Sequence, residues 1–328
     1  MGRLGRQDVA IPDRPSVGYS LLNMAPKHVV VIIPVFRDYD RARQTVAAIL
    51  RCSVPSPFSV RVHVVDDGSG DGTAERLSEQ FGGRIEIIGL PENLGRSAAR
   101  NAGATNISAD LLLFVDADCE PSDDRFLAAH LLSIREADVS MGVVEGQDDG
   151  FWHAYQQAAR VRRDRLARRT FVAHFTTQNV MIDARLFNSV GGFDEAFKGY
   201  GFEDRDLAIR LARAGARFTI APGARVIHRD TLDLAQVCRK MGEAGATTSQ
   251  IFASRYPFEY RTLGYEAIDG QRHPWRGVLA KLLWPVFQPW TQHDAWLQWR
   301  LVPFKLRAGI VRIMVAVSYL RGTLRRHR

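Results

Sequence analysis

The chain has 328 residues, enough for one large domain or one domain with an appendage. With 46% hydrophobic and 24% charged residues, it is not a disordered or fibrous protein. The formal net charge of +8 at pH 7 favours anionic partners, although the Arg- and Ala-rich bias of a GC-rich bacterial genome produces the same excess. The three widely spaced cysteines form no metal or disulfide pattern, which favours a reducing cytosol: Cys52, Cys119 and Cys238.

The N-terminal segment, residues 1–26, is polar and interrupted by Pro and Gly, and we expect a loose leader. It lacks the apolar core of a signal peptide, and Arg6 stands where a myristoylation signal needs Ser or Thr. No stretch of the chain reaches the ~18 uncharged apolar residues of a membrane span. The sequence therefore predicts a cytoplasmic protein, or one that is peripheral at the inner face of the plasma membrane.

Strands and helices alternate over the first third of the chain. Apolar runs predict strands at 28–35, 58–68, 84–88 and 109–118, and amphipathic stretches predict helices at 40–51, 71–81 and 93–106. This order predicts an α/β fold with a mostly parallel, Rossmann-like sheet and helices on both faces. Ligands bind such sheets at the carboxyl ends of the strands, so the acidic pairs after the second and fourth strands are expected to share one crevice.

Two acidic pairs follow these strands. In VVDDGSGDGT, Asp66 and Asp67 end the second strand, where one acid would be enough for a turn, and a carboxylate there can accept a hydrogen bond from a nucleobase imide. In VDAD, Asp116 and Asp118 would point the same way on an extended strand. Their repulsion favours a bound Mn²⁺ or Mg²⁺ that bridges a nucleotide's phosphates. The alternatives are a plain turn for the first pair and a solvated strand end for the second.

The predicted helix NLGRSAARNAGATN carries a polar stripe. On helical spacing Asn93, Arg96 and Arg100 fall on one side, while small residues form a face for close packing. The stripe either faces the acidic crevice, where it would help to bind a diphosphate or a base, or is a solvated charged face.

The segment GGFDEAFKGYGFEDRDLAIRL combines paired glycines with aromatics, which suggests backbone that turns closely beside a pocket. In the helix that follows, Asp204 heads an apolar stripe, whereas Asp206 is predicted on the solvent-facing side with Arg210 and Arg213. A general base would lie where Asp204 lies, although a helix N-terminus favours any acid. His228 ends a short apolar strand and would either complete the shell of a carboxylate-bound metal or be structural.

Six fragments in this order together resemble the family 2 glycosyltransferases, which have a GT-A fold: VIIPVF, VVDDGSGDGT, NLGRSAARNAG, VDADC, VGGFDEAF and GFEDRDLAIRL. The match spans about residues 28–230. The last two fragments also look like the acceptor segment of galactosyl- and N-acetylhexosaminyltransferases of GT-A type. The resemblance implies a GT-A catalytic domain over 27–230, with a nucleotide-binding half at 27–120 and an acceptor-binding half at 121–230. A helical C-terminal extension over 231–328 would follow.

The resemblance also implies roles for the residues that match the family's motifs. Those that would bind the nucleotide-sugar are Pro34, Val35, Asp66, Asp67, Asn93, Arg96, Arg100 and Asp116. Those that would bind the acceptor are Gly192, Phe193, Tyr200, Phe202 and Glu203. The metal ligands would be Asp118, Asp116 and His228, the last found in only some members, and Asp204 matches the catalytic base.

The implied reaction moves a sugar from a nucleotide-sugar donor, with a UDP-sugar favoured, to an acceptor hydroxyl. The Mn²⁺ or Mg²⁺ ion would neutralise the departing diphosphate, Asp204 would take the acceptor's proton, and one displacement would invert the anomeric centre. We expect this reaction in the synthesis of cell-envelope glycan, polysaccharide or glycolipid. Three departures from the family's pattern leave the identity of the sugar open: Cys119, Gln178 and Phe202.

Other classes of protein fit less well. A Rossmann dehydrogenase needs G-x-G-x-x-G after its first strand, and IIPVFRDYD lacks these glycines. A phosphatase with an Asp nucleophile would have no use for Asp204. A non-catalytic protein that retains the fold and binds a sugar nucleotide or a membrane surface stays open, and a turnover assay separates it from an enzyme.

The C-terminal part has two interpretations. A helix is predicted at 232–254. Further on, the helix predicted at 303–320 and the segment GVLAKLLWPVFQPW mix large apolar residues with Arg and Lys. They would either pack on the catalytic domain or form a homodimer interface, or they would lie on anionic lipid and bring the enzyme to a lipid-linked acceptor. The basic helix predicted at 151–170 lacks interleaved aromatics in its Arg-rich half, so no nucleic-acid partner is expected.

Overall fold

The structure is a computed structural model that describes residue 25 and residues 27–147, 150–167, 171–230, 232–299 and 301–325. The predicted leader therefore lies outside the described residues, apart from Ala25. The chain divides into two compact units. The first contains residues 1–147, 175–195 and 207–229, and the second contains residues 148–174, 196–206 and 230–328.

The first unit holds the strands and the helices between them. Its strands are β1 (His28–Val35), β2 (Ser59–Asp66), β3 (Glu86–Gly89), β4 (Leu111–Val115), β5 (Cys119–Pro121), β6 (Val139–Gly146), β7 (Asn179–Asp183) and β8 (Phe218–His228). Its helices are α1 (Tyr39–Arg51), α2 (Thr73–Phe81), α3 (Arg96–Ala104), α4 (Phe126–Ser133) and α6 (Ala184–Ser189). Helix α7 (Glu203–Arg213) begins in a segment of the second unit and ends in the first.

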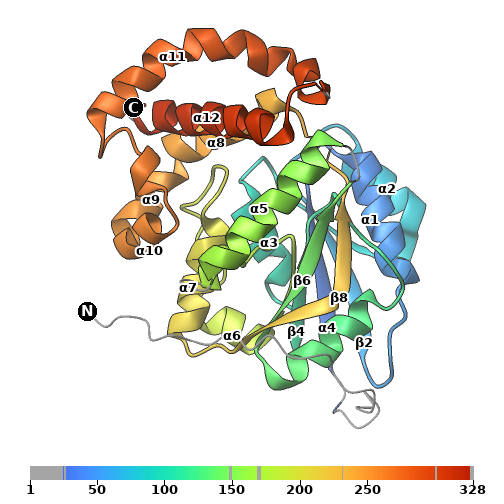
Figure 1. The fold of residues 1–328 in the computed structure, drawn as a ribbon. Helices are drawn as coiled ribbons and strands as arrows, with labels where there is room; N and C mark the ends of the chain where they lie inside the picture. Colours follow the sequence, from blue (N-terminus) through green and yellow to red (C-terminus); the bar gives the residue numbers. More distant parts are fainter. Residues whose placement is uncertain are drawn as a thin grey trace. The chain divides into compact units, whose positions relative to one another are not determined.

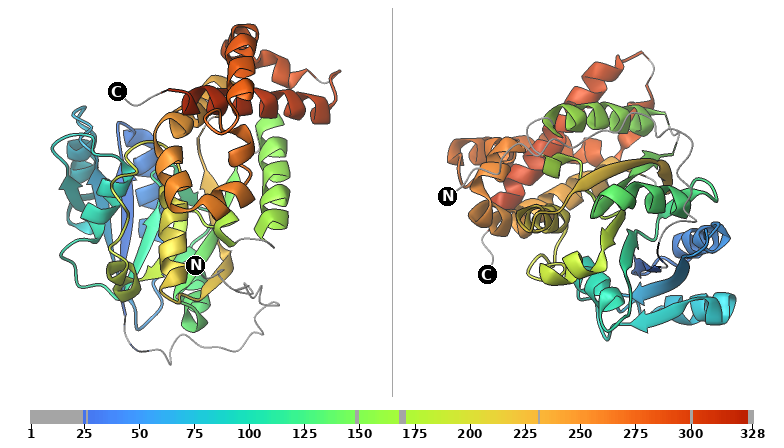
Figure 2. Two further views of the ribbon diagram at one scale, coloured as in Figure 1. Left: turned by 90° about the vertical axis from the view of Figure 1, so that its left-hand side faces the viewer. Right: turned by 90° about the horizontal axis from the view of Figure 1, so that it is seen from below.

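The eight strands form one sheet in the order β3-β2-β1-β4-β7-β6-β8-β5. Strands β3, β2, β1 and β4 are parallel, with Val31 of β1 opposite Val62 of β2 and Leu113 of β4. Strand β7 is antiparallel to both β4 and β6, and β8 is parallel to β6 and antiparallel to β5. The predicted α/β class and the mostly parallel sheet are confirmed, and Figures 1 and 2 show the helices of the first unit arranged around this sheet.

The two faces of the sheet are covered by different helices. Side chains alternate along a strand, so Val29, Val31 and Ile33 of β1 share one face, where they join a buried cluster with α1, α2 and α4. Ile32 points to the other face, where α3 packs so closely that a Cβ at Gly103 would lie 2.6 Å from its side chain. Helices therefore cover both faces, as predicted.

The second unit is helical. It contains α5 (Phe151–Ala167), α8 (Leu234–Ala246), α9 (Thr248–Arg255), α10 (Pro257–Thr262), α11 (Pro274–Gln292) and α12 (Phe304–Thr323). The helix predicted over 232–254 is in fact two helices, which part at Thr247. Helices α8 and α12 approach through glycines, because a Cβ at Gly245 would lie 2.5 Å from the carbonyl oxygen of Tyr319. Within the described residues, no helix has the length and apolar character needed to cross a membrane.

Candidate functional site

The turn from Asp116 to Asp118 stands at the carboxyl end of β4, beside the end of β1 in the same sheet. The strand predicted to reach residue 118 stops at Val115, and the N–H of Cys119 donates to the carbonyl of Asp116 (2.9 Å). The two carboxylates therefore belong to a turn and do not lie on one side of an extended strand. Thr45 of α1 fixes the turn, since its hydroxyl donates to the carbonyl of Ala117 (2.8 Å).

Asp116 forms an ion pair with a buried arginine. The Nη2 of Arg100 lies 2.7 Å from the Oδ1 of Asp116, and the arginine side chain is only 2% exposed. Its guanidinium also lies over the ring of Phe193, 5.3 Å from the centroid. The prediction that Arg100 serves the acidic crevice agrees with this geometry, and the alternative of a solvated charged face is wrong for this residue.

Asp118 meets a histidine from the far part of the chain. The Nε2 of His228, at the end of β8, lies 3.2 Å from the Oδ2 of Asp118. The antiparallel pairing of β5 with β8, which sets Cys119 opposite His228, brings the two together. The backbone N–H of Arg229 also donates to the carbonyl of Asp118 (2.7 Å). One ligand atom each from Asp118, Cys119 and His228 lies within 4.8 Å of the others, an arrangement that could hold a metal ion.

The ionisation of this cluster favours a carboxylate and a neutral thiol. Burial raises the pKa of Asp118, but the hydrogen bond and the charge of His228 outweigh it and hold that pKa below its ordinary value. Burial and the negative charge of Asp118 raise the pKa of Cys119 well above its ordinary value. The thiol of Cys119 donates to the Oδ1 of Asp118 (3.6 Å).

The donor set fits a hard or borderline cation. A carboxylate from Asp118 and an imidazole from His228 suit Mn²⁺, whereas a thiol suits softer ions such as Zn²⁺. We therefore assign Cys119 to hydrogen bonding with Asp118 and not to the metal shell. Among the described residues the cluster does not include Asp116, which was expected to share the metal and instead pairs with Arg100.

The two carboxylates of the acidic pair at the end of β2, Asp66 and Asp67, accept hydrogen bonds from other groups of the protein. Asp66 caps its own turn, accepting a short hydrogen bond from the hydroxyl of Ser69 and a longer one from its N–H (3.4 Å). Asp67 accepts from the N–H groups of Leu94 (2.8 Å) and Gly95 (3.0 Å). Burial raises the pKa of Asp67 against the lowering effect of these two amides. Both carboxylates are buried, so their first role is to shape the loops at this edge of the sheet.

The other predicted nucleotide-binding residues differ in their exposure to solvent: Pro34, Val35, Asn93 and Arg96. Pro34 and Val35 end β1, and the carbonyl of Val35 accepts from the N–H of Asp67 (2.9 Å). Arg96 is exposed at the first turn of α3. Asn93 is also exposed but precedes α3, so the predicted helical stripe of Asn93, Arg96 and Arg100 is wrong.

The loop that holds Gly192 and Phe193 is clamped from two sides. Asn101 of α3 accepts from the N–H of Phe193 (2.8 Å) and donates to its carbonyl (2.9 Å). Arg210 of α7 donates to the carbonyls of Val190 and Gly192, each at 2.7 Å. Arg210 is therefore a loop anchor, and its predicted solvent-facing role is wrong.

The first turn of α7 carries three acids with different surroundings. Asp204 is 18% exposed, and its Oδ1 accepts from the N–H of Arg205 (2.8 Å). Asp206 was predicted to face solvent but is fully buried, where the hydroxyl of Tyr256 donates to it (2.8 Å) and Arg255 lies at 3.6 Å. Glu203 is also buried. Asp204 is thus the member of this group with a carboxylate that solvent or a substrate can reach.

Two further predicted acceptor residues precede α7. The N–H of Tyr200 donates to Glu243 of α8 (2.9 Å), and its carbonyl accepts from the hydroxyl of Thr248 (2.9 Å). Phe202 packs on Phe252 with the ring centroids 4.8 Å apart. Its φ of +72° lies in the left-handed region that favours glycine, at the position where the family's pattern often has Gly. The packed ring of Phe202 offsets this backbone strain.

The sequence analysis missed two groups of the candidate site. Asp38 caps α1 and pairs with Arg41 (2.6 Å), and both residues act electrostatically on the Asp118 region. Asn101 was missed as the residue that fixes the Phe193 loop. Asp38 could have been found, because it follows β1 at the same sheet edge as Asp66 and Asp116.

Comparison with known proteins gives two family matches. The family described as Glycosyl transferase family 2 matches residues 30–191, and the N-terminal domain of galactosyltransferase matches residues 160–231. A pre-mycofactocin glycosyltransferase from Mycobacterium tuberculosis is 29% identical over 245 residues, which cover 71% of this chain and 49% of that protein. The chain thus spans about half the length of this curated relative.

Solved structures share the fold. The mannosyltransferase PcManGT from Pyrobaculum calidifontis, in complex with GDP-Man and Mn²⁺, matches with a TM-score of 0.60 at 17% identity, covering 89% of this chain and 86% of that chain. GalNAc-T7 with UDP, GalNAc and Mn²⁺ matches with a TM-score of 0.50 at 17% identity, covering 63% of this chain and 44% of that chain. The solved neighbours agree with the fold of the described sheet. The chain belongs to the family 2 glycosyltransferases and has the GT-A fold.

Proposed function

We propose that this chain transfers a sugar from a nucleotide-sugar donor, with a UDP-sugar favoured, to an acceptor hydroxyl and inverts the anomeric centre. The observation that carries the proposal is the contact of Asp118 with His228 at 3.2 Å, at the edge of a GT-A sheet. Two neighbours that share this fold hold Mn²⁺ together with GDP-Man or UDP, which supports a nucleotide-sugar donor here.

Asp118 and His228 would hold Mn²⁺ or Mg²⁺. When bound, such an ion supplies positive charge for a leaving diphosphate. The protein's part is to keep the Asp118 carboxylate ionised and oriented, through His228, the thiol of Cys119 and the N–H of Arg229. Thr45 holds the turn between the two aspartates in place.

The nucleotide would lie along the carboxyl ends of β1, β2 and β4. Arg100 orients Asp116, and this 19% exposed carboxylate could accept hydrogen bonds from a ribose. Asp66 and Asp67 hold the loops that would border the base, beside Pro34 and Val35. Arg96 and Asn93, both exposed at the start of α3, would contact the nucleotide directly.

Asp204 would act as the general base that takes the proton from the acceptor hydroxyl. Its carboxylate is the accessible one of the three acids at the start of α7, and the neighbouring Arg205 orients it (2.8 Å). Gly192, Phe193, Tyr200, Phe202 and Glu203 would shape the acceptor site from clamped loops. Phe193, Phe202 and Glu203 are buried, so they would support the acceptor site from behind.

The acceptor is proposed to belong to cell-envelope glycan, polysaccharide or glycolipid synthesis, on the cytoplasmic side of the membrane. A non-catalytic protein that binds a sugar nucleotide is the other candidate. The accessible carboxylate of Asp204 favours the enzyme, because a binding protein would need no base there.

A turnover assay tests the proposal. The full chain is incubated with Mn²⁺, a hydroxyl acceptor or water, and each of several UDP-, GDP- and dTDP-sugars, and release of the nucleoside diphosphate is measured. We expect release with one donor, and Asp204→Asn is expected to slow it by roughly 10²-fold or more while nucleotide binding stays unchanged. Asp40→Asn is the matched control, because Asp40 is an exposed acid in the first turn of α1.

The outcomes separate the two candidates. Nucleotide binding with no release from any donor would favour the non-catalytic protein. Release that is equal in Asp204→Asn and in Asp40→Asn would remove Asp204 as the base and leave the transfer itself in place.

A further inference from the structure

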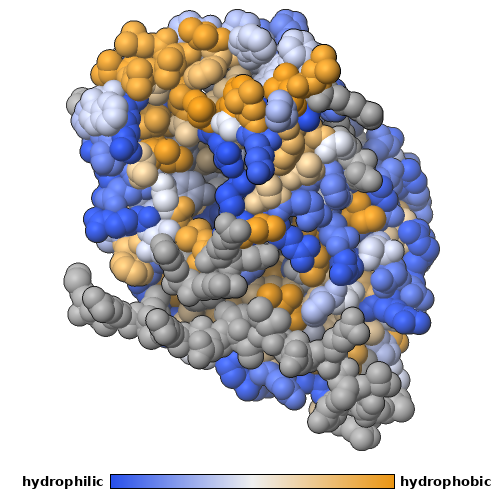
Figure 3. All heavy atoms as spheres, in the orientation of Figure 1, coloured by the Kyte–Doolittle hydropathy of each residue, from blue (hydrophilic) through white to orange (hydrophobic). Residues whose placement is uncertain are grey.

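Helix α11 of the second unit exposes a row of large apolar side chains. They recur at three- and four-residue spacing and therefore share one side of the helix: Trp275, Val278, Leu279, Leu282, Val286 and Trp290. Leu282 in the middle of the row is 69% exposed. Figure 3 shows hydrophobic residues gathered over α11, with hydrophilic residues beside them.

The opposite side of α11 is already packed. Gly277 and Ala280 are buried, and Trp284 and Phe287 pack against a cluster that includes Val317 and Leu320 of α12. A helix that covers a core in water normally presents polar residues outward. Here the outward side is as apolar as the inward one, so the exposed row is not explained by packing within the chain.

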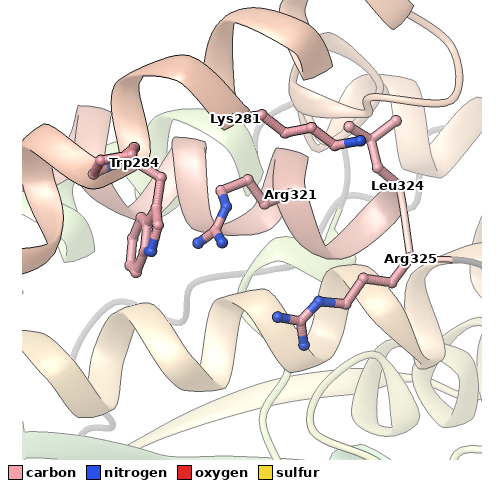
Figure 4. Close-up of a pocket in the computed structure, with 6 residues that line it drawn as sticks. Lys281, Trp284, Arg321, Leu324 and Arg325 are labelled. Atoms are coloured by element: carbon pink, nitrogen blue, oxygen red, sulfur yellow. The ribbon is translucent and has the colours of Figure 1, made fainter.

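A cationic pocket borders this row. It is a cavity of about 380 Å³, and its lining residues come from α11, α12 and the residues that follow α12: Lys281, Trp284, Pro285, Arg321, Leu324 and Arg325. Figure 4 shows the three cationic side chains, with the guanidinium of Arg321 beside Trp284, 4.2 Å from the ring centroid. Two residues of α11 that line the pocket, Lys281 and Pro285, are next in sequence to Leu282 and Val286 of the apolar row. The pocket therefore lies at the edge of this row.

The described residues that line this pocket include three cations and no acid, and the acid that shares a cavity with Arg321 and Arg325 is Glu243 of α8. Asp294 is the only acidic residue between Gly270 and Arg328. Lys281, Arg321 and Arg325 line one pocket, where like charges repel, and burial together with the positive charge of Arg325 lowers the pKa of Arg321. An anion bound among Lys281, Arg321 and Arg325 would relieve this repulsion.

We propose that α11 lies in the surface of a membrane that contains anionic phospholipid. Its apolar row would lie at the boundary between the head groups and the acyl chains. The phosphate of one lipid would lie in the pocket formed by Lys281, Arg321 and Arg325. A row of Trp, Leu and Val with Lys and Arg at its border has the apolar area and the positive charge that bind a helix to the surface of an anionic membrane. A symmetric contact with a second copy would cover the row but would also bring a second set of the pocket's positive charges.

Of the two C-terminal segments that the sequence offered for a membrane contact, this assignment takes GVLAKLLWPVFQPW, which lies in α11, and not the helix predicted at 303–320. Val311, Met314 and Val317 of α12 are buried, so α12 is a packed helix. Membrane binding by α11 needs neither donor nor acceptor, and it can fail or succeed independently of the proposed sugar transfer.

Vesicle flotation of the full chain tests the proposal, without nucleotide. The probes are vesicles of phosphatidylcholine alone and of phosphatidylcholine with about one-third phosphatidylglycerol. We expect the chain to float only with the anionic vesicles. Leu282→Glu is expected to weaken partition by roughly 10-fold or more, and the pair Lys281→Gln and Arg325→Gln by roughly 10- to 30-fold. The controls are Phe258→Glu on α10, which is as exposed as Leu282, and Lys305→Gln at the start of α12.

Each outcome bears on the proposal. Loss of flotation in the α11 and pocket variants, with both controls unchanged, supports it. Absence of flotation with wild-type protein overturns it, and so does flotation that Leu282→Glu leaves unchanged. If the wild type sediments as a dimer and Leu282→Glu as a monomer, with no vesicle binding by either, a second copy covers the row and the proposal is wrong.

Discussion

The sequence left the role of Arg100 open, and the structure decides it. Its helical position allowed either a solvated side chain or one directed to the acidic crevice, and it is buried against Asp116 and the ring of Phe193. Removing one partner of such a buried pair typically costs about 3–5 kcal/mol. The choice depends on how α3 packs on the sheet and on the turn after β4, which local spacing does not specify.

His130 gives the first prediction. It is fully buried, with Ser140 at 3.0 Å from Nδ1 and Asn179 at 2.8 Å from Nε2, and burial lowers its pKa to about 4. The unfolded chain takes up a proton near pH 6.5, whereas the folded chain takes it up only near pH 4. Stability is therefore lost as the pH falls from about 6.5 to about 4. Lowering the pH from 7.5 to 5.0 is expected to lower the free energy of unfolding by about 2 kcal/mol through His130.

Denaturant titrations at both pH values measure this effect. The variant His130→Gln, which can keep the hydrogen bonds without titrating, is expected to lose about this part of the pH dependence. His28→Gln, which changes an exposed histidine, should behave like the wild type. An equal loss of stability in His130→Gln and the wild type would show that His130 is not the group responsible.

The start of α3 shows why the boundaries of an element are hard to predict. The pattern suggested a helix from residue 93, but α3 begins at Arg96, after Gly95 with a φ of +91°. Asp67 accepts the N–H groups of Leu94 and Gly95 and so provides the partners that these amides need before the helix begins. The carboxylate of Asp67, 27 positions before Leu94, helps to set where α3 begins. The residues of the helix itself do not indicate this boundary.

Gly103 gives the second prediction, on the packing of α3 against the sheet. A Cβ there would lie 2.6 Å from the side chain of Ile32 and 2.9 Å from that of Val65. Gly103→Ala is expected to cost roughly 1–3 kcal/mol of unfolding free energy, because overpacked cores must shift to accept new atoms. Gly83→Ala is the control in the same unit, since a Cβ there meets nothing within 4 Å.

Thermal and denaturant unfolding of the two variants decides the matter. We expect Gly103→Ala to unfold well before the wild type and Gly83→Ala to stay within about 0.5 kcal/mol of it. If Gly103→Ala is as stable as the control, then α3 does not press on β1 and β2 as described.

Taken over the whole chain, the parallel half of the sheet was predictable and the other half was not. The order strand, helix, strand over residues 28–115 is enough to predict parallel neighbours, and β3, β2, β1 and β4 follow it. The antiparallel pairing of β7 with β4 joins residues 64 to 72 positions apart, and the pairing of β5 with β8 joins residues more than a hundred positions apart. That long-range pairing brings His228 to Asp118, whereas the sequence pattern alone left His228 as either a metal ligand or a structural residue.

The family resemblance and the two comparisons of sequence and structure agree on a glycosyltransferase. Burial then revises several side chains within the site. Asp206 is buried and bonded to Tyr256, and Arg210 holds the Gly192 loop, although the helical pattern had placed both in solvent. The pattern could not show this, because partners from other parts of the chain cover that side of α7.

The central claim is that Asp118 holds a divalent metal for a nucleotide. Calorimetric titration of UDP, GDP and dTDP, with and without Mn²⁺, tests this claim. The proteins compared are the wild type, Asp118→Asn and the control Asp124→Asn, which changes an exposed acid six positions after Asp118. We predict that one nucleotide binds in a Mn²⁺-dependent way, that Asp118→Asn weakens this binding by roughly 10-fold or more, and that Asp124→Asn leaves it unchanged. Folded wild-type protein that binds none of the three with Mn²⁺, or an Asp118→Asn variant that binds as well as wild type, would contradict the claim.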